Sequence, residues 1–322
     1  MKNKISISIA VITFNSEKTI IETLNSILNQ TYGSKNIELI VSDDASKDST
    51  REIVGHWLST NSIFFKNTVF ISNEKNTGIS KNCNAAWKMV NSEWVKTIAG
   101  DDILLPDCIA LNAEEAAIVE ENVAVIFSLM KSFSTNSQNE KLVGDIYPPK
   151  YQIDILSKNI DLQFKYLQKG DLAVAPTSFI RVSSLKKANY ADERFHLIED
   201  LPLWFRFSEM KMKLHFMPSL TVMYRVGESV TSSRERLVNK CFINEIEKID
   251  KIVINQTIPW FLFLLRIRKY MWPILVRFVV FIFNNHATFI SKKILSMVLL
   301  VKPYGGRRLL YKFLTRVLNK KH

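Results

Sequence analysis

Two pairs of adjacent carboxylates, Asp43-Asp44 and Asp101-Asp102, closely follow apolar runs of this sequence. An acidic pair at a strand end can hold a hard divalent cation through oxygen, and the cation can neutralise a diphosphate. The pair at 101–102 suits this role. The pair at 43–44 could accept hydrogen bonds from the N–H edge of a base or from ribose hydroxyls. The alternative is that Asp43, like Asp48, only caps a turn or a helix.

The segments that would position these carboxylates alternate between strand and helix patterns over residues 5–127. The βαβαβαβ order implies an α/β fold whose mainly parallel sheet is covered by helices on both faces. Ligands of such sheets bind beyond the carboxyl ends of the strands. The predicted strands are Ile5–Ile12, Ile37–Val41, Val69–Ser72, Trp94–Ala99 and Val123–Phe127. The predicted helices run from Ser16 to about Gln30, from Asp48 or Ser49 through Leu58, over Ser80–Val90, and from Pro106 through Glu121.

Each of the first four predicted strands ends in polar residues, with Thr13–Asn15 after the first and Asn76–Gly78 after the third. One polar strand end is weak evidence, whereas four together, two of them with adjacent carboxylates, indicate a site. No G-x-x-x-x-G-K-[ST] or G-x-G-x-x-G pattern occurs, so neither a P-loop nor a dinucleotide fingerprint explains them. The five histidines form no metal-binding spacing. Among them, His196 could border an acceptor pocket, and a structural role is the simpler interpretation.

Four motifs in a fixed order carry a resemblance to a known enzyme family. They are Ile12–Asn15 (ITFN), Val41–Thr50 (VSDDASKDST), Asn76–Asn84 (NTGISKNCN) and Gly100–Pro106 (GDDILLP). In this order they resemble the family 2 glycosyltransferases. The similarity continues at Ile198–Arg206 and Tyr224–Ser232, so that it covers roughly residues 5–233. The resemblance implies a GT-A, Rossmann-like fold and a nucleotide-sugar-dependent inverting enzyme.

The resemblance also implies roles for individual residues. Asp44 is similar to the aspartate that reads the uracil edge, and Thr13 and Asn15 lie where the family lines the nucleotide pocket. Asp200 is similar to the catalytic base, with Glu199 as the alternative, and one of the two could instead cap the following helix. The residues expected to bind the nucleotide-sugar are Thr13, Phe14, Asn15, Asp43, Asp44, Asn76, Gly78, Lys81, Asp101 and Arg225.

The acidic motif implies a site for a divalent cation, Mg²⁺ or Mn²⁺, with Asp102 as the metal ligand and Asp101 near the ribose or the metal. Many members of the family have another Asp two places before Asp101, where this chain has Ala99, so cation binding could be weak. Gly227 stands where many relatives have His, which removes one phosphate or metal contact. For Arg225, a phosphate contact and a structural ion pair are both open.

Inversion requires a sugar hydroxyl to attack the anomeric carbon from the face opposite the diphosphate. A carboxylate that takes the hydroxyl proton is typically worth about 10²–10⁴-fold in rate. We therefore expect metal-assisted transfer of one sugar, from a UDP-sugar, to a lipid-linked oligosaccharide or a cell-surface polysaccharide precursor. A non-catalytic nucleotide-sugar-binding scaffold is the main alternative. A nucleotidyltransferase is another, but it usually has a Gly-rich loop after the first strand, and Thr13–Lys18 contains no Gly.

The catalytic domain is expected over residues 1–235, with a nucleotide-sugar half of about 1–130 and an acceptor half of about 131–235. The pattern weakens after residue 135, and fewer elements can be assigned there. The predictions are a helix over Ile153–Gln168, short strands over Phe179–Val182 and Leu214–Met217, and a helix over Leu201–Met210.

The net charge of +12 resides in the last part of the chain. Residues 251–322 hold 14 of the 43 Lys and Arg residues and no Asp or Glu, whereas residues 1–250 hold 29 basic and 31 acidic side chains. Such asymmetry is typical of a segment that meets an anionic surface. The apolar density is too high for a surface that tracks nucleic-acid phosphates, so we expect no nucleic-acid partner. The longest uncharged runs, 14 residues each, are shorter than the roughly 20 needed to span a bilayer.

We expect residues 236–322 to form a basic amphipathic helical region, whose 251–322 part lies on an anionic membrane surface. A helical subdomain packed on the body, or an oligomer contact, is the alternative.

Three cysteines without C-x-x-C spacing indicate a reducing compartment. The first apolar run alternates like a strand and not like a signal peptide. The expected location is therefore cytoplasmic and peripheral, on the inner face of the cell membrane.

Overall fold

The computed structural model describes residues 5–135, 140–227 and 235–303. The chain divides into two compact units, one of Met1–Phe164 and Leu172–Val226, the other of Lys165–Asp171 and Gly227–His322. The domain boundary at residue 235 stays a prediction, since residues 228–234 lie outside the described part of the chain. So do the last residues of the Tyr224–Ser232 motif and residues 304–322 of the basic region.

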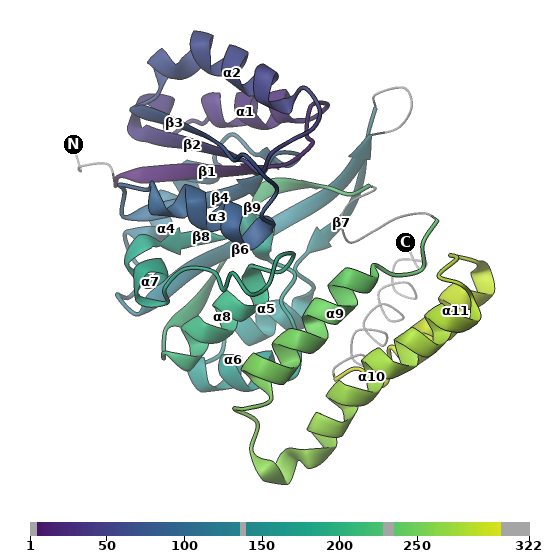
Figure 1. Cartoon of the computed structure of the whole chain (residues 1–322). Helices are drawn as coiled ribbons and strands as arrows, with labels where there is room; N and C mark the ends of the chain where they lie inside the picture. Colours follow the sequence, from purple (N-terminus) through teal and green to yellow (C-terminus); the bar gives the residue numbers. More distant parts are fainter. Residues whose placement is uncertain (1–4, 136–139, 228–234, 304–322) are drawn as a thin grey trace, which may run out of the picture. The chain divides into compact units, whose positions relative to one another are not determined.

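Within the described residues the first unit is built on one nine-stranded sheet, in the order β3-β2-β1-β4-β8-β6-β9-β5, with β7 paired to β6 (Figure 1). The strands are β1 (Ile7–Thr13), β2 (Ile37–Asp43), β3 (Asn67–Ser72), β4 (Trp94–Ala99), β5 (Ile103–Leu104), β6 (Val123–Thr135), β7 (Lys141–Tyr147), β8 (Phe179–Arg181) and β9 (Lys213–Arg225). The first four are parallel, and β6 pairs in parallel with β9. Because β8 is antiparallel to both β4 and β6, six strands share one direction. This confirms the predicted α/β class and mainly parallel sheet.

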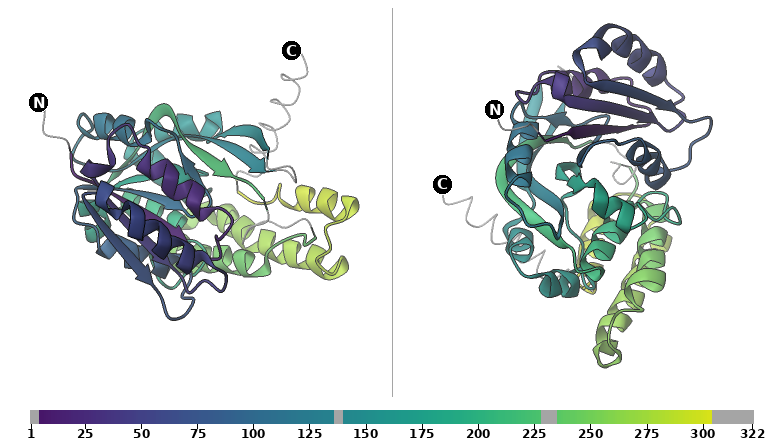
Figure 2. Two further views of the ribbon diagram at one scale, coloured as in Figure 1. Left: turned by 90° about the horizontal axis from the view of Figure 1, so that it is seen from above. Right: turned by 90° about the vertical axis from the view of Figure 1, so that its left-hand side faces the viewer.

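Helices cover both faces of the β1–β3 part of the sheet (Figures 1 and 2). The helices before residue 226 are α1 (Ile20–Leu28), α2 (Thr50–Asn61), α3 (Ile79–Lys88), α4 (Cys108–Ala116), α5 (Lys150–Leu156), α6 (Ile160–Leu167), α7 (Val182–Lys187) and α8 (Asp200–Glu209). Ile9 and Val11 belong to the same buried apolar cluster as Leu24 of α1. On the other face, the hydroxyl of Ser42 donates to Asn82 of α3 at 2.6 Å. The period-2 alternation of the strands thus assigns α1 and α2 to one face and α3 to the other.

The acceptor half differs most from the sequence predictions. The prediction of a single helix over Ile153–Gln168 was wrong, because this segment contains two separate helices, α5 and α6. Asn159 starts the second one, since its Oδ1 accepts a hydrogen bond from the amide of Leu162 at 3.0 Å. The strand predicted over Leu214–Met217 is only the beginning of β9, which continues because it pairs with β6 as far as Arg225. Strand β7 was not predicted, because nearly all of its side chains are exposed and show no alternation.

The second unit is helical in its described residues, with α9 (Lys240–Ile249), α10 (Phe263–Ile282) and α11 (Phe289–Val298). Asn239 caps α9 by accepting a hydrogen bond from the amide of Cys241 at 2.9 Å. Lys269 of α10 and Asp250 form a buried ion pair. None of the helices in residues 5–135, 140–227 and 235–303 combines the length and the apolar character needed to span a bilayer.

Candidate functional site

The carboxyl ends of β1, β2 and β4 are joined by backbone hydrogen bonds. The amide of Asp44 donates to the carbonyl of Thr13 at 3.0 Å, and the amide of Gly100 donates to the carbonyl of Ile12 at 2.9 Å. The loops that follow the three strands therefore form one continuous polar edge of the sheet. This is the edge where the sequence predicts a site.

Gly100 fits closely against Thr13, whose side chain is buried. A Cβ at position 100 would lie 2.7 Å from Thr13 Oγ1 and 2.9 Å from Thr13 Cβ, so a larger residue would push the loop away. Thr13 Oγ1 itself is buried and has no hydrogen-bond partner in the described residues. The packing of these two residues holds the acidic loop after β4 against the end of β1.

Asn15 fastens the loop after β1 to the loop after β2. Its φ is +52°, in the left-handed region that Asn tolerates better than most residues. Its side-chain Oδ1 accepts a hydrogen bond from the amide of Lys47 at 2.8 Å, and its own amide donates to Ser46 Oγ at 2.8 Å. The ring of neighbouring Phe14 is 40% exposed and accessible to a ligand at this edge.

Asp43 and Asp48 make the capping contacts that the sequence left open as their simpler role. Asp43 is fully buried and accepts hydrogen bonds from the amide of Ser46, at 2.9 Å, and from its hydroxyl. Asp48 accepts a hydrogen bond from the amide of Thr50 at 3.0 Å, at the start of α2. These contacts favour a turn-forming role for Asp43 over a direct contact with the nucleotide.

Asp44 is buried, and both of its carboxylate oxygens contact the loop between β3 and α3. Oδ1 accepts hydrogen bonds from the amide and hydroxyl of Thr77 at 2.9 and 3.0 Å, and Oδ2 accepts one from the amide of Gly78 at 2.8 Å. Asn73 Nδ2 lies 3.3 Å from Oδ1. A carboxylate has about four acceptor positions, so a base could still donate to Oδ2.

Gly78 joins this loop to the segment that leads into α8. Its φ is +91°, and a Cβ there would lie 2.8 Å from the carbonyl oxygen of His196, so that only Gly fits. The amide of Ile79 donates to the same carbonyl at 2.6 Å, and His196 Nδ1 lies 3.3 Å from the carbonyl oxygen of Thr77. His196 therefore lies directly beside the loop held by Asp44.

Glu199 and Asp200 lie at the N-terminus of α8. Asp200 Oδ1 accepts a hydrogen bond from the amide of Leu201 at 2.7 Å, whereas Glu199 makes no side-chain capping bond. Burial, reinforced by the charge of Asp200, raises the pKa of Glu199 to about 8. Glu199 therefore holds its proton near neutral pH, which leaves Asp200 as the better general base of the two.

Asp44, which is predicted to bind the nucleobase, and the predicted catalytic pair Glu199-Asp200 all lie near helix α3. Cys83 of α3 is a buried thiol whose pKa is raised, first by burial and then by the charges of Glu199, Asp200 and Asp44. All three carboxylates are therefore within electrostatic range of one buried atom.

Asp101 and Asp102 differ in how accessible they are. Asp102 is 1% exposed, and its Oδ1 accepts a hydrogen bond from the amide of Arg225 at 2.8 Å, whereas Asp101 is only partly buried. Burial raises the pKa of both carboxyls, and that of Asp102 is raised further by the charge of Asp101. The sequence assigned the metal first to Asp102, but the geometry favours Asp101 as the more accessible ligand.

The guanidinium of Arg225 is held by four neighbours. Nε donates to the carbonyl of Asp101 at 2.8 Å, Nη1 donates to the hydroxyl of Thr135 at 2.7 Å, and Nη2 pairs with Glu22. The guanidinium also lies 4.5 Å from the ring centroid of Phe133. These contacts favour the structural ion pair that the sequence left open for this arginine, which fixes the loop after β4.

Lys96 of β4 was not predicted as part of the site. Its side chain is fully buried, and its ammonium group donates to backbone carbonyls that include that of Pro176 at 2.6 Å. Burial lowers the pKa of Lys96 to about 8, while Cys108 and Asp102 partly oppose this effect. A buried positive charge thus lies within range of the acidic pair. Its only signal in the sequence is one lysine within an apolar run.

The acidic pair fits a shared cation better than a cation held by protein alone. In the described residues no three His, Cys, Asp or Glu side chains stand together as a metal site. Ala99 is exposed at the end of β4 and offers no ligand. Asp101 and Asp102 provide the hard oxygens that Mg²⁺ or Mn²⁺ prefers, and such cations often bind one or two carboxylates together with substrate phosphates.

The two remaining predicted residues are on the surface. Asn76 is exposed in the loop before α3, and Lys81 is exposed on α3 itself. Lys81 also lines a cavity of about 780 Å³ between α3 and residues 188–194.

The chain matches the family model described as Glycosyl transferase family 2 over residues 8–187, more than half of its length, and therefore belongs to this family. It is 26% identical over 221 residues to "Uncharacterized glycosyltransferase MJ1057" of Methanocaldococcus jannaschii, a match that covers 68% of this chain and 70% of that protein. It is 28% identical over 153 residues to "UDP-Glc:alpha-D-GlcNAc-diphosphoundecaprenol beta-1,3-glucosyltransferase WfgD" of Escherichia coli, covering 48% of this chain and 55% of that one.

A third relative is "Poly(ribitol-phosphate) beta-N-acetylglucosaminyltransferase TarS" of Staphylococcus aureus, 27% identical over 194 residues. This match covers 60% of the chain but only 30% of TarS. The solved TarS fragment 1-349 in complex with UDP-GlcNAc has a TM-score of 0.59 at 19% identity, covering 92% of this chain and 82% of that one. The mannosyltransferase PcManGT of Pyrobaculum calidifontis, solved with GDP-Man and Mn²⁺, has a TM-score of 0.53 at 14% identity, covering 94% and 70%. The similarities confirm the predicted GT-A fold, and the family confirms that the protein is a glycosyltransferase.

Proposed function

We propose that this protein is an inverting glycosyltransferase that moves a sugar from a UDP-sugar to a hydroxyl of a lipid-linked oligosaccharide or a cell-envelope polysaccharide precursor. The main support is the unbroken line of contacts along one edge of the sheet. It runs from Gly100 to Thr13, from Thr13 to Asp44, and from Asp44 through Gly78 to His196. These contacts hold the acidic loop, the loop bound by Asp44 and the segment before α8 in fixed positions relative to one another.

The donor is proposed to lie along this edge. Phe14, Asn15 and Asp44 border the position proposed for the base and ribose, while Asn76 and Lys81 flank it on the next loop and helix. UDP as the nucleotide is supported by two relatives: WfgD is named for UDP-Glc, and TarS was solved with UDP-GlcNAc.

The transfer step needs a base on the face opposite the diphosphate. The acceptor oxygen forms a bond to the anomeric carbon, the bond from that carbon to the diphosphate breaks, and the hydroxyl proton passes to the carboxylate of Asp200. Glu199, protonated near neutral pH, adds no second negative charge beside the base. Such a base typically contributes about 10²–10⁴-fold to the rate.

Asp101 and Asp102 would hold a divalent cation, Mg²⁺ or Mn²⁺. When bound, the cation supplies positive charge that stabilises the departing diphosphate. Arg225 positions the loop of both carboxylates through its contacts to the Asp101 carbonyl and the Asp102 side chain. Lys96 supplies a further positive charge from within the sheet.

The acceptor side is proposed to lie at a membrane surface. WfgD is named for an acceptor linked to diphosphoundecaprenol. On α10, exposed apolar side chains recur every three or four residues, namely Leu264, Ile267, Met271, Ile274, Phe278 and Phe281. Residues 251–322 carry 14 basic and no acidic side chains. An exposed apolar stripe with basic residues around it is typical of helices that lie in the membrane interface. We propose a peripheral position on the cytoplasmic side of the membrane.

Calorimetric titration with UDP, with and without Mn²⁺, tests the donor site. We expect binding that Mn²⁺ strengthens, and we expect Asp101→Asn to remove most of that effect. Asp107→Asn, an exposed carboxylate in the next loop, is the matched control and should keep it. Absence of UDP binding under both conditions would contradict the proposal.

A nucleotide-sugar-binding scaffold without transfer activity is the second candidate. Ala99 favours it, because a carboxylate present in many relatives is missing at an exposed position of the site. Such a protein would bind UDP but release none from any UDP-sugar in the presence of acceptor.

A further inference from the structure

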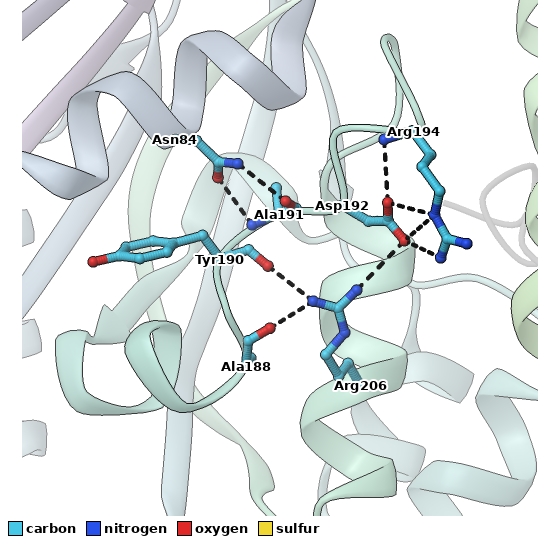
Figure 3. Close-up of polar contacts among 7 residues, drawn as sticks. All are labelled: Asn84, Ala188, Tyr190, Ala191, Asp192, Arg194 and Arg206. Carbon is cyan, nitrogen blue, oxygen red and sulfur yellow. Dashed lines mark hydrogen bonds and ion pairs between the residues drawn. The ribbon is translucent and has the colours of Figure 1, made fainter.

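A cavity of about 780 Å³ lies between α3 and the loop that precedes α8. Of the residues predicted to bind the nucleotide-sugar, Lys81 alone lines it. Asn84, residues 188–194 and Arg206 form much of its wall. Figure 3 shows the polar contacts among several of these residues. All of these residues belong to the first unit.

The wall of this cavity contains a strained turn. Asn189 and Tyr190 have φ values of +56° and +61°, in the left-handed region, which is strained for a bulky residue such as Tyr190. Arg206 of α8 holds the turn, because its Nη1 donates to the carbonyls of Ala188 and Tyr190 at 2.5 and 3.2 Å (Figure 3). Strain that a protein maintains in this way is concentrated at ligand sites.

A buried amide fixes the next residue of the same loop. Asn84 is 3% exposed, and its Oδ1 accepts a hydrogen bond from the amide of Ala191 at 2.9 Å. Its Nδ2 donates to the carbonyl of Ala191 at 3.0 Å (Figure 3). The same Nδ2 also donates to Glu193 at 2.9 Å. The loop is thus held in one shape from both α3 and α8, so the cavity exists before any ligand binds.

The lining of the cavity is rich in cations. Asp192 pairs with two arginines, Arg194 at 2.5 Å and Arg206 at 3.5 Å, so one carboxylate faces two guanidinium groups (Figure 3). Lys88 lies 3.9 Å from Glu193 and 5.9 Å from the ring centroid of Tyr190. The charged side chains of the lining are Lys81, Lys88, Arg194 and Arg206 against Asp192 and Glu193. The excess of positive charge, with an aromatic ring beside it, fits a ligand that carries a phosphate on a polyol or sugar.

The segments that line the cavity lead directly into the proposed catalytic edge. Helix α3 is one wall, and residues 188–194 are the other. The amide of Ile79, at the start of α3, donates to the carbonyl of His196, which lies two residues after the second wall and three before Glu199. We propose, resting on the proposed function, that this cavity is an acceptor subsite for a phosphate-bearing glycan. Lys81, Lys88 and Arg194 contact the phosphate, and the ring of Tyr190 contacts the adjoining polyol or sugar.

Calorimetry on the full chain tests the subsite, with the donor site filled by saturating UDP. One arm titrates glycerol 3-phosphate, a polyol phosphate, and the other titrates a soluble short-chain prenyl diphosphate, so that the two sources of phosphate are distinguished. The test variant is Lys88→Gln combined with Arg194→Gln, two exposed side chains whose loss leaves the core intact. The control is Lys158→Gln, which removes an exposed positive charge that does not line the cavity.

We expect one of the two phosphates to bind the wild-type protein and the control equally. Loss of charge-assisted contacts in the double variant should weaken that binding by about tenfold or more. Equal affinity for wild type and double variant, or no binding in either arm, would overturn the subsite. The result for UDP is separate: a protein that binds UDP but neither phosphate contradicts this inference alone, whereas failure to bind UDP contradicts the proposed function.

Discussion

The amide of Ile79 donates a hydrogen bond of 2.6 Å to the carbonyl oxygen of His196. This contact joins the first residue of α3 to the segment before α8. The loop that contacts the Asp44 carboxylate and the chain that carries Glu199 and Asp200 therefore hold each other in place. A disturbance at this point should affect nucleotide affinity and transfer together.

Gly78→Ala tests the junction directly. The new Cβ would lie 2.8 Å from the carbonyl oxygen of His196, at a φ of +91°. We expect the free energy of unfolding to fall by about 1–3 kcal/mol and UDP binding to weaken as the loop shifts. Urea unfolding and UDP titration measure the two effects.

The matched control is Gly55→Ala in α2, where a Cβ would meet nothing within 4 Å. There Ala should stabilise the helix by about 0.5–1 kcal/mol and leave UDP affinity unchanged. The role given to Gly78 is wrong if both substitutions have the same effect.

Ala99→Asp should strengthen cation binding. Position 99 is exposed at the end of β4, next to the loop of Asp101, so a third carboxylate would add a hard oxygen ligand. We expect the affinity of the UDP-bound protein for Mn²⁺ to rise by on the order of tenfold, whereas Ala99→Asn, without the charge, should change it little. Unchanged Mn²⁺ affinity in the Asp variant would mean that the acidic pair does not hold the cation.

The pKa of Glu199 predicts a pH-dependent stability. In the folded protein this pKa is raised to about 8, from 4.5 for the free side chain. Between these values the folded state keeps a proton that the unfolded state releases, so the stability of the wild type falls as pH rises through this window. Glu199→Gln does not titrate. Its free energy of unfolding, measured in urea, should therefore exceed that of the wild type by an amount that grows with pH to on the order of 1–3 kcal/mol. A difference that is constant with pH would contradict the burial of this carboxyl.

The exposed face of α10 should bind anionic vesicles. Phe278 and Phe281 are 60% and 84% exposed, and burying a large apolar side chain is worth about 1.5–3 kcal/mol. Replacing both with Ser should reduce binding to phosphatidylglycerol vesicles by more than about tenfold in a flotation assay. Ile118→Ser, at a 78% exposed position of the first unit, is the control and should bind as the wild type does. Equal flotation of all three proteins would exclude the α10 face as the membrane contact.

The sequence predicted the sheet and its polar edge because both depend on local patterns. The strands that end at Thr13, Asp43 and Ala99 show short apolar runs followed by polar residues. These patterns can be recognised without knowing which distant segments the strands contact. Strand β7 shows no such alternation, since both of its faces are exposed.

Contacts between distant segments could not be predicted in the same way. Nothing in the local sequence indicates that Arg225 pairs with Glu22, or that Asn84 holds Ala191. The same is true of Asp102, since the sequence does not indicate that the amide of Arg225 in β9 donates a hydrogen bond to its carboxylate. Roles that depend on which carboxylate is accessible require the folded arrangement.

We propose Asp200 as the base for transfer of the sugar from a UDP-sugar. The most direct measurement is UDP release from a panel of UDP-sugars, with membranes that carry lipid-linked acceptors, for the wild type and for Asp200→Asn. We predict acceptor-dependent release by the wild type with at least one sugar, and a fall of about 10²–10⁴-fold in the variant while UDP affinity is retained. Equal release by both proteins, or no release by a wild type that binds UDP, would contradict the claim.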